Sequence, residues 1–163
     1  MVREMTGKKI RHSKTGRPFI GQSADISISH SGDLVGAAMV PAPYRIGIDL
    51  EQLKSDLNSR LFIGSVIGNK EAVFLKKFCA DNDLPISSGI AIFWSVKESF
   101  FKCLDYDLIP GKISILSISK LGKIQFSFSG EIEKVMRERG LIIHSATTSF
   151  KGGYIFSQTV MVS

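Results

Sequence analysis

Two segments in which apolar and polar residues alternate limit what this chain can fold into. Residues 25–30 read Asp-Ile-Ser-Ile-Ser-His, and residues 46–51 read Ile-Gly-Ile-Asp-Leu-Glu. Because successive side chains of a β-strand point to opposite faces, this period of two predicts strands with one buried face. A turn signal, Ser-Gly-Asp at 31–33, separates the first segment from an apolar segment at 34–40, which predicts a β-hairpin.

Downstream of residue 51 the pattern becomes helical and then returns to strands. Helical spacing is weak at 57–66, clear at 70–80 and strong at 88–104, where Ser87 or Ser88 is the expected N-cap. Further strands are predicted at 112–119, 123–129, 141–149 and 154–162, with a short charged helix at 131–139. The expected fold class is therefore α+β, an antiparallel sheet with packed helices, and residues 1–163 are expected to form a single domain.

The charge balance favours anionic partners. The 163 residues include 21 basic and 15 acidic side chains, a net charge of +6. The basic residues are scattered without interleaved aromatic residues, so we expect no nucleic acid as partner. No apolar run approaches the roughly 20 residues that a membrane span needs, so no membrane is expected. Cys79 and Cys103 lack metal-ligand spacing, and reduced thiols in a cytoplasmic protein are favoured over a disulfide.

Three carboxylates in two segments suggest a site for one divalent cation. Asp49 and Glu51 point to the same side of the strand predicted at 46–51, and Glu98 lies one helical turn before Lys102. A hard cation held by a few carboxylates, with other positions left to phosphate oxygens, is how Mg²⁺ usually binds. Taken singly, the first two residues are more often solvated carboxylates, and the helical pair is more often a surface ion pair.

Four elements in a fixed order resemble a known family. They are Gly-Arg-Pro at 16–18, Ile-Ser-His-Ser at 28–31, Ile-Gly-Ile-Asp-Leu-Glu at 46–51 and Trp-Ser-Val-Lys-Glu-Ser-Phe-Phe-Lys at 94–102. In this order they resemble the 4′-phosphopantetheinyl transferase superfamily, most closely its larger, surfactin-synthetase-activating type. The resemblance implies a phosphopantetheinyl transferase-like fold and an Mg²⁺-dependent enzyme with coenzyme A as co-substrate.

The implied reaction moves the 4′-phosphopantetheine arm of coenzyme A to a serine of an acyl or peptidyl carrier protein and releases 3′,5′-ADP. The implied metal ligands are Asp49, Glu51 and Glu98. The implied catalytic residues are Glu98, Lys102 and His30, with Glu98 also a candidate to take the serine proton. The implied contacts to coenzyme A are Gly16, Arg17, Pro18, Ser29, His30 and Lys102. The alternative is a non-catalytic relative that binds coenzyme A or a carrier protein.

The chain departs from the larger type at its N-terminal end. Larger members consist of two similar halves with the site in the seam, but here only 48 residues precede Asp49. Residues 1–45 are therefore interpreted as a reduced N-terminal half, and residues 46–163 as the C-terminal half with the metal site. An oligomer or partner subunit could complete the seam.

Basic residues of the N-terminal half normally grip the 3′-phosphate of coenzyme A. Two interpretations of a basic cluster near the N-terminus stay open: it binds the 3′-phosphate in place of those residues, or it is solvated surface charge. Its members are Lys8, Lys9, Arg11 and Lys14. Two interpretations of Lys97 stay open, a contact to phosphate and a surface charge. The segment after Lys102, through about Ser117, is a candidate surface for docking the carrier protein.

Overall fold

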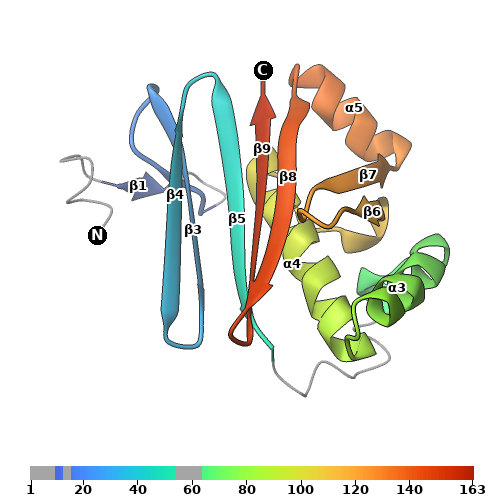
Figure 1. The fold of residues 1–163 in the computed structure, drawn as a ribbon. Helices are drawn as coiled ribbons and strands as arrows, with labels where there is room; N and C mark the ends of the chain where they lie inside the picture. Colours follow the sequence, from blue (N-terminus) through green and yellow to red (C-terminus); the bar gives the residue numbers. More distant parts are fainter. Residues whose placement is uncertain (1–9, 13–15, 54–63) are drawn as a thin grey trace.

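The computed structural model describes residues 10–12, 16–53 and 64–163, and its elements match the sequence patterns closely (Figure 1). The strands are β1 (Arg11–His12), β2 (Pro18–Phe19), β3 (Ala24–Ser31), β4 (Leu34–Pro41), β5 (Tyr44–Gln52), β6 (Ile113–Ile118), β7 (Ile124–Phe128), β8 (Ile142–Lys151) and β9 (Tyr154–Val162). The described helices are α3 (Asn69–Asp81), α4 (Ile86–Leu104) and α5 (Gly130–Glu138), with a 3-10 turn η1 (Pro110–Lys112). The α+β class is confirmed.

Two details of the helix predictions differ from the structure. The helix expected at 57–66 falls mostly outside the described residues. The prediction of Ser87 or Ser88 as the N-cap of α4 is wrong, because the helix begins at Ile86 and its N-cap is Pro85. Proline has no backbone N–H, so it cannot extend a helix backwards but is tolerated at its start.

The predicted antiparallel strands form three separate sheets. Their orders are β1-β2-β3-β4, β5-β9-β8 and β6-β7. The hairpin of β3 and β4 lies beside β5 but does not pair with it through the backbone (Figure 1).

Side chains of β3 replace the missing backbone pairing. Backbone N–H groups of β5 donate in turn to the carboxylate of Asp25 and to the hydroxyl oxygens of the serines at 27, 29 and 31, at 2.8 to 3.1 Å. Because these four acceptors occupy alternate positions, they all point to the same face of β3. The alternation at 25–31 therefore attaches the hairpin to β5, in addition to defining a strand.

Helix α4 forms the centre of the molecule. It contacts β5 and β9 along one side and α3 along another (Figure 1). The aromatic residues expected in the core take part in it: Phe93, Phe100 and Phe101 are buried, and half-buried Trp94 packs against the same core.

Cys79 and Cys103 are buried and free. Among the residues described, no helix is long and apolar enough to span a lipid bilayer.

Candidate active site

Helix α4 lies directly on strand β5 because residue 47 is glycine. A Cβ atom at Gly47 would overlap the carbonyl oxygen of Ser99 and the backbone nitrogen of Cys103. Any side chain there would push the helix off the strand, since a packed interior has no room to absorb it. The close contact brings together the two segments that carry the predicted metal ligands. The alternating pattern at 46–51 contains this glycine but does not reveal its role.

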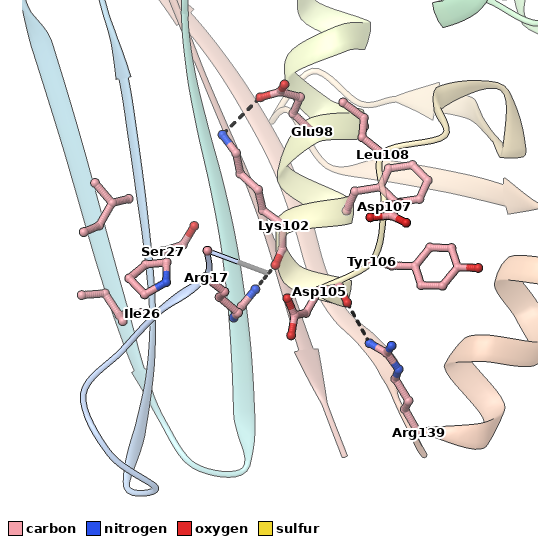
Figure 2. Close-up of a pocket in the computed structure, with 14 residues that line it drawn as sticks. Arg17, Ile26, Ser27, Glu98, Lys102, Asp105, Tyr106, Asp107, Leu108 and Arg139 are labelled. Carbon is pink, nitrogen blue, oxygen red and sulfur yellow. Dashed lines mark hydrogen bonds and ion pairs between the residues drawn. The ribbon is translucent and has the colours of Figure 1, made fainter. Parts of the chain in front are cut away.

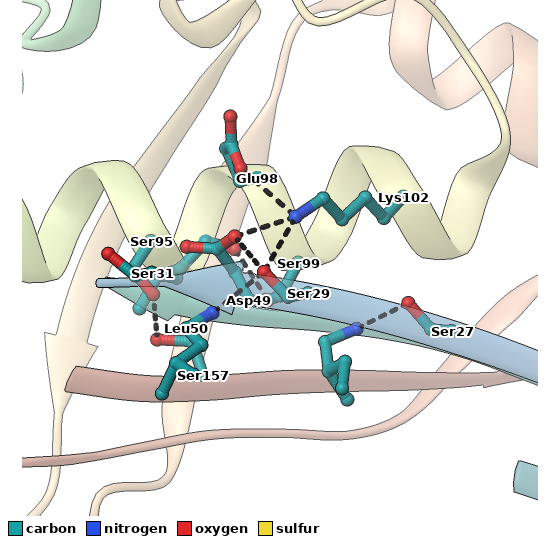
Figure 3. Close-up of polar contacts among 12 residues, drawn as sticks. Ser27, Ser29, Ser31, Asp49, Leu50, Ser95, Glu98, Ser99, Lys102 and Ser157 are labelled. Carbon is teal, nitrogen blue, oxygen red and sulfur yellow. Dashed lines mark hydrogen bonds and ion pairs between the residues drawn. The ribbon is translucent and has the colours of Figure 1, made fainter. Parts of the chain in front are cut away.

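Lys102 joins two of the three predicted carboxylates. Its Nζ lies 2.6 Å from Oδ1 of Asp49 and 3.1 Å from Oε2 of Glu98 (Figure 3). Glu98 and Lys102 are one turn apart on α4, as predicted, and Asp49 comes from the middle of β5. The resulting cluster holds two carboxylates around one ammonium group.

Asp49 is buried and incompletely hydrogen-bonded. Its Oδ1 accepts from the hydroxyl of Ser29 at 3.1 Å and from Lys102, whereas its Oδ2 is buried and has no hydrogen-bond partner among the described residues. The same serine oxygen accepts from the backbone N–H of Leu50. Because a hydroxyl has one proton, Ser29 here holds Asp49 in place rather than donating to a phosphate. The orphaned oxygen marks a position where a cation would fit.

The electrostatics of the cluster favour an additional positive charge. Burial, the neighbouring Asp49 and only partial compensation by Lys102 together raise the pKa of Glu98 to about 7. Burial alone would lower the pKa of Lys102, but the charges of Asp49 and Glu98 outweigh it and raise that pKa. The two carboxylates are thus not fully neutralised by one ammonium group.

Glu51 does not join this cluster. Residues two apart on a strand are about 6.6 Å apart, so Glu51 lies one pleat repeat beyond Asp49. Within the described ranges, no three His, Cys, Asp or Glu side chains lie close enough to share a metal ion. The structure therefore brings together Asp49 and Glu98 but not the predicted set of three carboxylates.

Ser29 and His30 lie on opposite faces of β3. Ser29 points toward β5, and His30, paired across the hairpin with Val35, is exposed on the other face. Neighbouring residues of a strand cannot both face the same ligand without a bulge. His30 does not line the cavity described below.

The Gly-Arg-Pro loop contacts the helix that carries Glu98 and Lys102. The guanidinium of Arg17 donates to the carbonyl oxygens of Lys102 and Ile46 and pairs with the carboxylate of Asp25. Gly16 has a φ of +80°, which the absence of a Cβ permits. Arg17 thus ties the loop to both β5 and α4, in addition to lining the cavity with its two neighbours.

A cavity of about 600 Å³ lies between β3 and the C-terminal half of α4 (Figure 2). Glu98 and Lys102 line its upper part in this view, and Arg139 lies at its lower end. Sequence reasoning missed Arg139, and it named the segment at 105–108 only as a docking surface. That segment follows α4 and lines the cavity.

The structure contradicts both interpretations of Lys97, as a phosphate contact and as a surface charge. Its side chain is fully buried and forms an ion pair with Glu71 at 2.6 Å, so it is neither a surface charge nor a phosphate contact. Glu71 lies on α3, 26 residues away, and no local pattern reveals this pairing.

Comparisons with known proteins identify the fold. No family model matches the chain, and no curated protein matches it. Solved structures do: holo-acyl-carrier-protein synthase from Neisseria meningitidis superposes with a TM-score of 0.61 at 19% identity, over 73% of this chain and 98% of that one. The enzyme from Plasmodium yoelii superposes with a TM-score of 0.56 at 24% identity, over 73% of this chain and 94% of that one. The enzyme from Helicobacter pylori, solved with coenzyme A, has a TM-score of 0.50 at 26% identity. This match covers 72% of this chain and 99% of that one.

The chain thus has the fold of the phosphopantetheinyl transferase superfamily, and the resemblance inferred from its motifs is confirmed at that level. Among proteins with this fold, it resembles the holo-acyl-carrier-protein synthase type, nearly all of whose length it covers. The prediction of the larger type is corrected accordingly. Roughly a quarter of this chain lies outside each of these matches.

Proposed function

We propose that this protein is a 4′-phosphopantetheinyl transferase that uses Mg²⁺ and moves the phosphopantetheine arm of coenzyme A to a serine of an acyl or peptidyl carrier protein. The observation that carries the proposal is the cluster of Asp49, Glu98 and Lys102 at a cavity in a fold shared with holo-acyl-carrier-protein synthases. Three of the matched structures contain coenzyme A or ADP, which supports a nucleotide-containing substrate.

Asp49 and Glu98 fit a divalent cation on two counts. The buried Oδ2 of Asp49 has no partner, and the charge of Asp49 makes ionisation of Glu98 more difficult. These two residues would hold the ion, and Glu51 stays a proposed ligand through its position on the same side of β5. When bound, Mg²⁺ would neutralise charge on the diphosphate oxygens and so favour departure of the leaving group.

Lys102 and Glu98 are assigned the remaining chemistry. Lys102 donates to a phosphate oxygen as a point charge. The serine oxygen forms a bond to the β-phosphorus, and the bond from that phosphorus to the bridging oxygen breaks. The bridging oxygen leaves with the electron pair on 3′,5′-ADP. The serine proton passes to Glu98, directly or through a water molecule.

The N-terminal residues belong to the same proposed domain. Arg17 donates to the carbonyl oxygen of Lys102, and Ser29 donates to Asp49, so these two described residues of the proposed N-terminal segment contact the proposed metal-binding half. Gly16, Arg17 and Pro18 are proposed contacts of coenzyme A. His30 could act as a catalytic contact only if β3 changed its orientation. The net charge of +6 would speed the encounter with an acidic carrier protein. The reduced thiols favour a cytoplasmic location.

The test is incubation with coenzyme A, Mg²⁺ and an apo carrier protein, followed by mass spectrometry of the carrier. We expect the carrier to gain the mass of one phosphopantetheine group. The variant Asp49→Asn, which keeps the side-chain shape, should slow the transfer by about 10²- to 10³-fold. Binding of coenzyme A without any mass gain at high protein concentration would instead favour the non-catalytic alternative.

A further inference from the structure

The lower end of the cavity contains an arginine that no motif assigned. Arg139 directly follows α5, and its Nη1 donates to the carbonyl oxygens of Leu104 at 2.5 Å and Asp105 at 3.1 Å (Figure 2). Its guanidinium also lies 5.9 Å from the centre of the Tyr106 ring. These contacts fix the guanidinium at the end of α4, on the wall of the cavity.

Arg139 differs from the other two cations of the cavity in its partners among the described residues. Arg17 pairs with Asp25, and Lys102 pairs with Asp49 and Glu98. Among the described residues, no ion pair includes Arg139. Nη1 uses its two N–H groups on the helix carbonyls, so Nε and Nη2 retain three donors.

We propose that Arg139 binds the 3′-phosphate of coenzyme A, which makes it a specificity-determining residue for the nucleotide. This inference rests on the proposed function. The reacting diphosphate has to lie at Glu98 and Lys102, and the cavity continues from there along the last turns of α4 to Arg139. Of the two ends of coenzyme A, the pantetheine arm is uncharged, whereas the adenosine end bears a phosphate dianion. A guanidinium with free donors matches the dianion, because it can form two parallel charge-assisted hydrogen bonds.

The competing explanation is that Arg139 only caps the C-terminus of α4. A cap would stabilise the helix but would treat coenzyme A and 3′-dephospho-coenzyme A alike. The two explanations therefore differ in ligand preference and not in stability.

The experiment measures the Kd of coenzyme A and of 3′-dephospho-coenzyme A by calorimetry with Mg²⁺ and without carrier protein. We expect the unmodified protein to prefer coenzyme A, and Arg139→Gln to reduce that preference by about tenfold, the loss expected for a charge-assisted contact. Arg139→Lys should restore part of the preference. Arg137→Gln is the matched control, because Arg137 lies in the last turn of α5, just before Arg139, but does not line the cavity.

The outcomes separate this inference from the proposed function. An unmodified protein that binds both ligands equally, or an Arg139→Gln variant that keeps the full preference, would overturn the assignment of Arg139 and leave the transferase proposal intact. A protein that binds neither ligand would overturn both.

A second measurement covers the case in which Arg139→Gln does not fold. The unmodified protein is treated with phenylglyoxal, which modifies accessible guanidinium groups, and its peptides are mapped by mass spectrometry. We expect 3′,5′-ADP to protect Arg139, and 5′-ADP, which lacks the 3′-phosphate, to protect it markedly less. Equal protection by both nucleotides would exclude a 3′-phosphate contact.

Discussion

Two lysines of α4, five residues apart in sequence, form two very different clusters. Lys97 pairs with Glu71 in the core, and Lys102 pairs with Asp49 and Glu98 beside the cavity. The side chains of Lys97 and Glu71 are 0% exposed, whereas that of Lys102 is 35% exposed. The same pair of residue types thus serves in one place as a structural link and in the other as a candidate reactive site.

The core cluster is saturated with hydrogen bonds. Lys97 donates to Glu71 at 2.6 Å and to the carbonyl oxygens of Val66 at 2.6 Å and Pro110 at 3.2 Å. The other oxygen of Glu71 accepts from the backbone N–H of Ile115 at 2.7 Å. An ammonium group has three donors, and all three are used here. Burial lowers the pKa of Lys97 even though Glu71 opposes this.

The cavity cluster is unsaturated by comparison. Asp49 keeps a buried oxygen without a partner, and Glu98 has its pKa raised to about 7. Unsatisfied groups cost stability, so a cluster that retains them beside a cavity is a candidate functional site. Completeness of hydrogen bonding, more than residue type, therefore separates the structural pair from the candidate reactive one.

The largest expected effect comes from breaking the core pair. Lys97→Met should lower the free energy of unfolding by about 3–5 kcal/mol, because it leaves the carboxylate of Glu71 buried without its counter-charge. Lys102→Met should lower it by a smaller amount, about 1–3 kcal/mol, because Lys102 is partly solvated but its removal leaves the buried carboxylate of Asp49 without its counter-charge. This variant should also lose most transfer activity. Urea denaturation and the carrier-mass assay measure the two effects.

The double variant Glu71→Gln with Lys97→Met provides the control for this comparison. It removes both charges and keeps an acceptor for Ile115, so it should recover part of the lost stability. If Lys97→Met and Lys102→Met destabilise the protein equally, the distinction between the two clusters is wrong.

Local patterns predicted the fold and part of the site. Alternation located β3 and β5, and the spacing of four predicted that Glu98 and Lys102 would meet. The partners of Lys97 were not predictable, because Glu71 lies on another helix and only packing brings it near. Arg139 was missed for the same reason, since it reaches the cavity from beyond the motifs.

The next effect concerns metal and pH. In the absence of divalent cations, the pKa of Glu98 in the folded protein is raised from its ordinary value of 4.5 to about 7. Glu98 therefore keeps its proton up to about that pH. This group's contribution to stability therefore falls as pH rises through that range. Because Mg²⁺ requires ionised carboxylates, the Tm increase that it causes should grow from pH 5.5 to pH 8. Mg²⁺ at about 100 times its Kd would contribute about 2.7 kcal/mol, a shift of about 5–10 °C.

Asp49→Asn is the control for the metal prediction. It removes one proposed ligand and, with it, the contribution that Asp49 adds to burial in raising the pKa of Glu98, so the Mg²⁺-dependent shift should disappear. Scanning calorimetry at both pH values measures it. A shift that does not depend on pH, or one that persists in Asp49→Asn, would mean that Mg²⁺ binds elsewhere.

The smallest expected effect isolates one hydrogen bond at the edge of the cavity cluster. Ser29 and Ser31 each accept a backbone N–H of β5, but Ser29 also donates to Asp49. Ser29→Ala and Ser31→Ala should each cost about 1 kcal/mol of stability. Only Ser29→Ala should weaken Mg²⁺ binding and slow transfer, by about tenfold, because Asp49 then loses the group that orients it. Equal effects of the two variants on turnover would mean that the hairpin acts only through its attachment to β5.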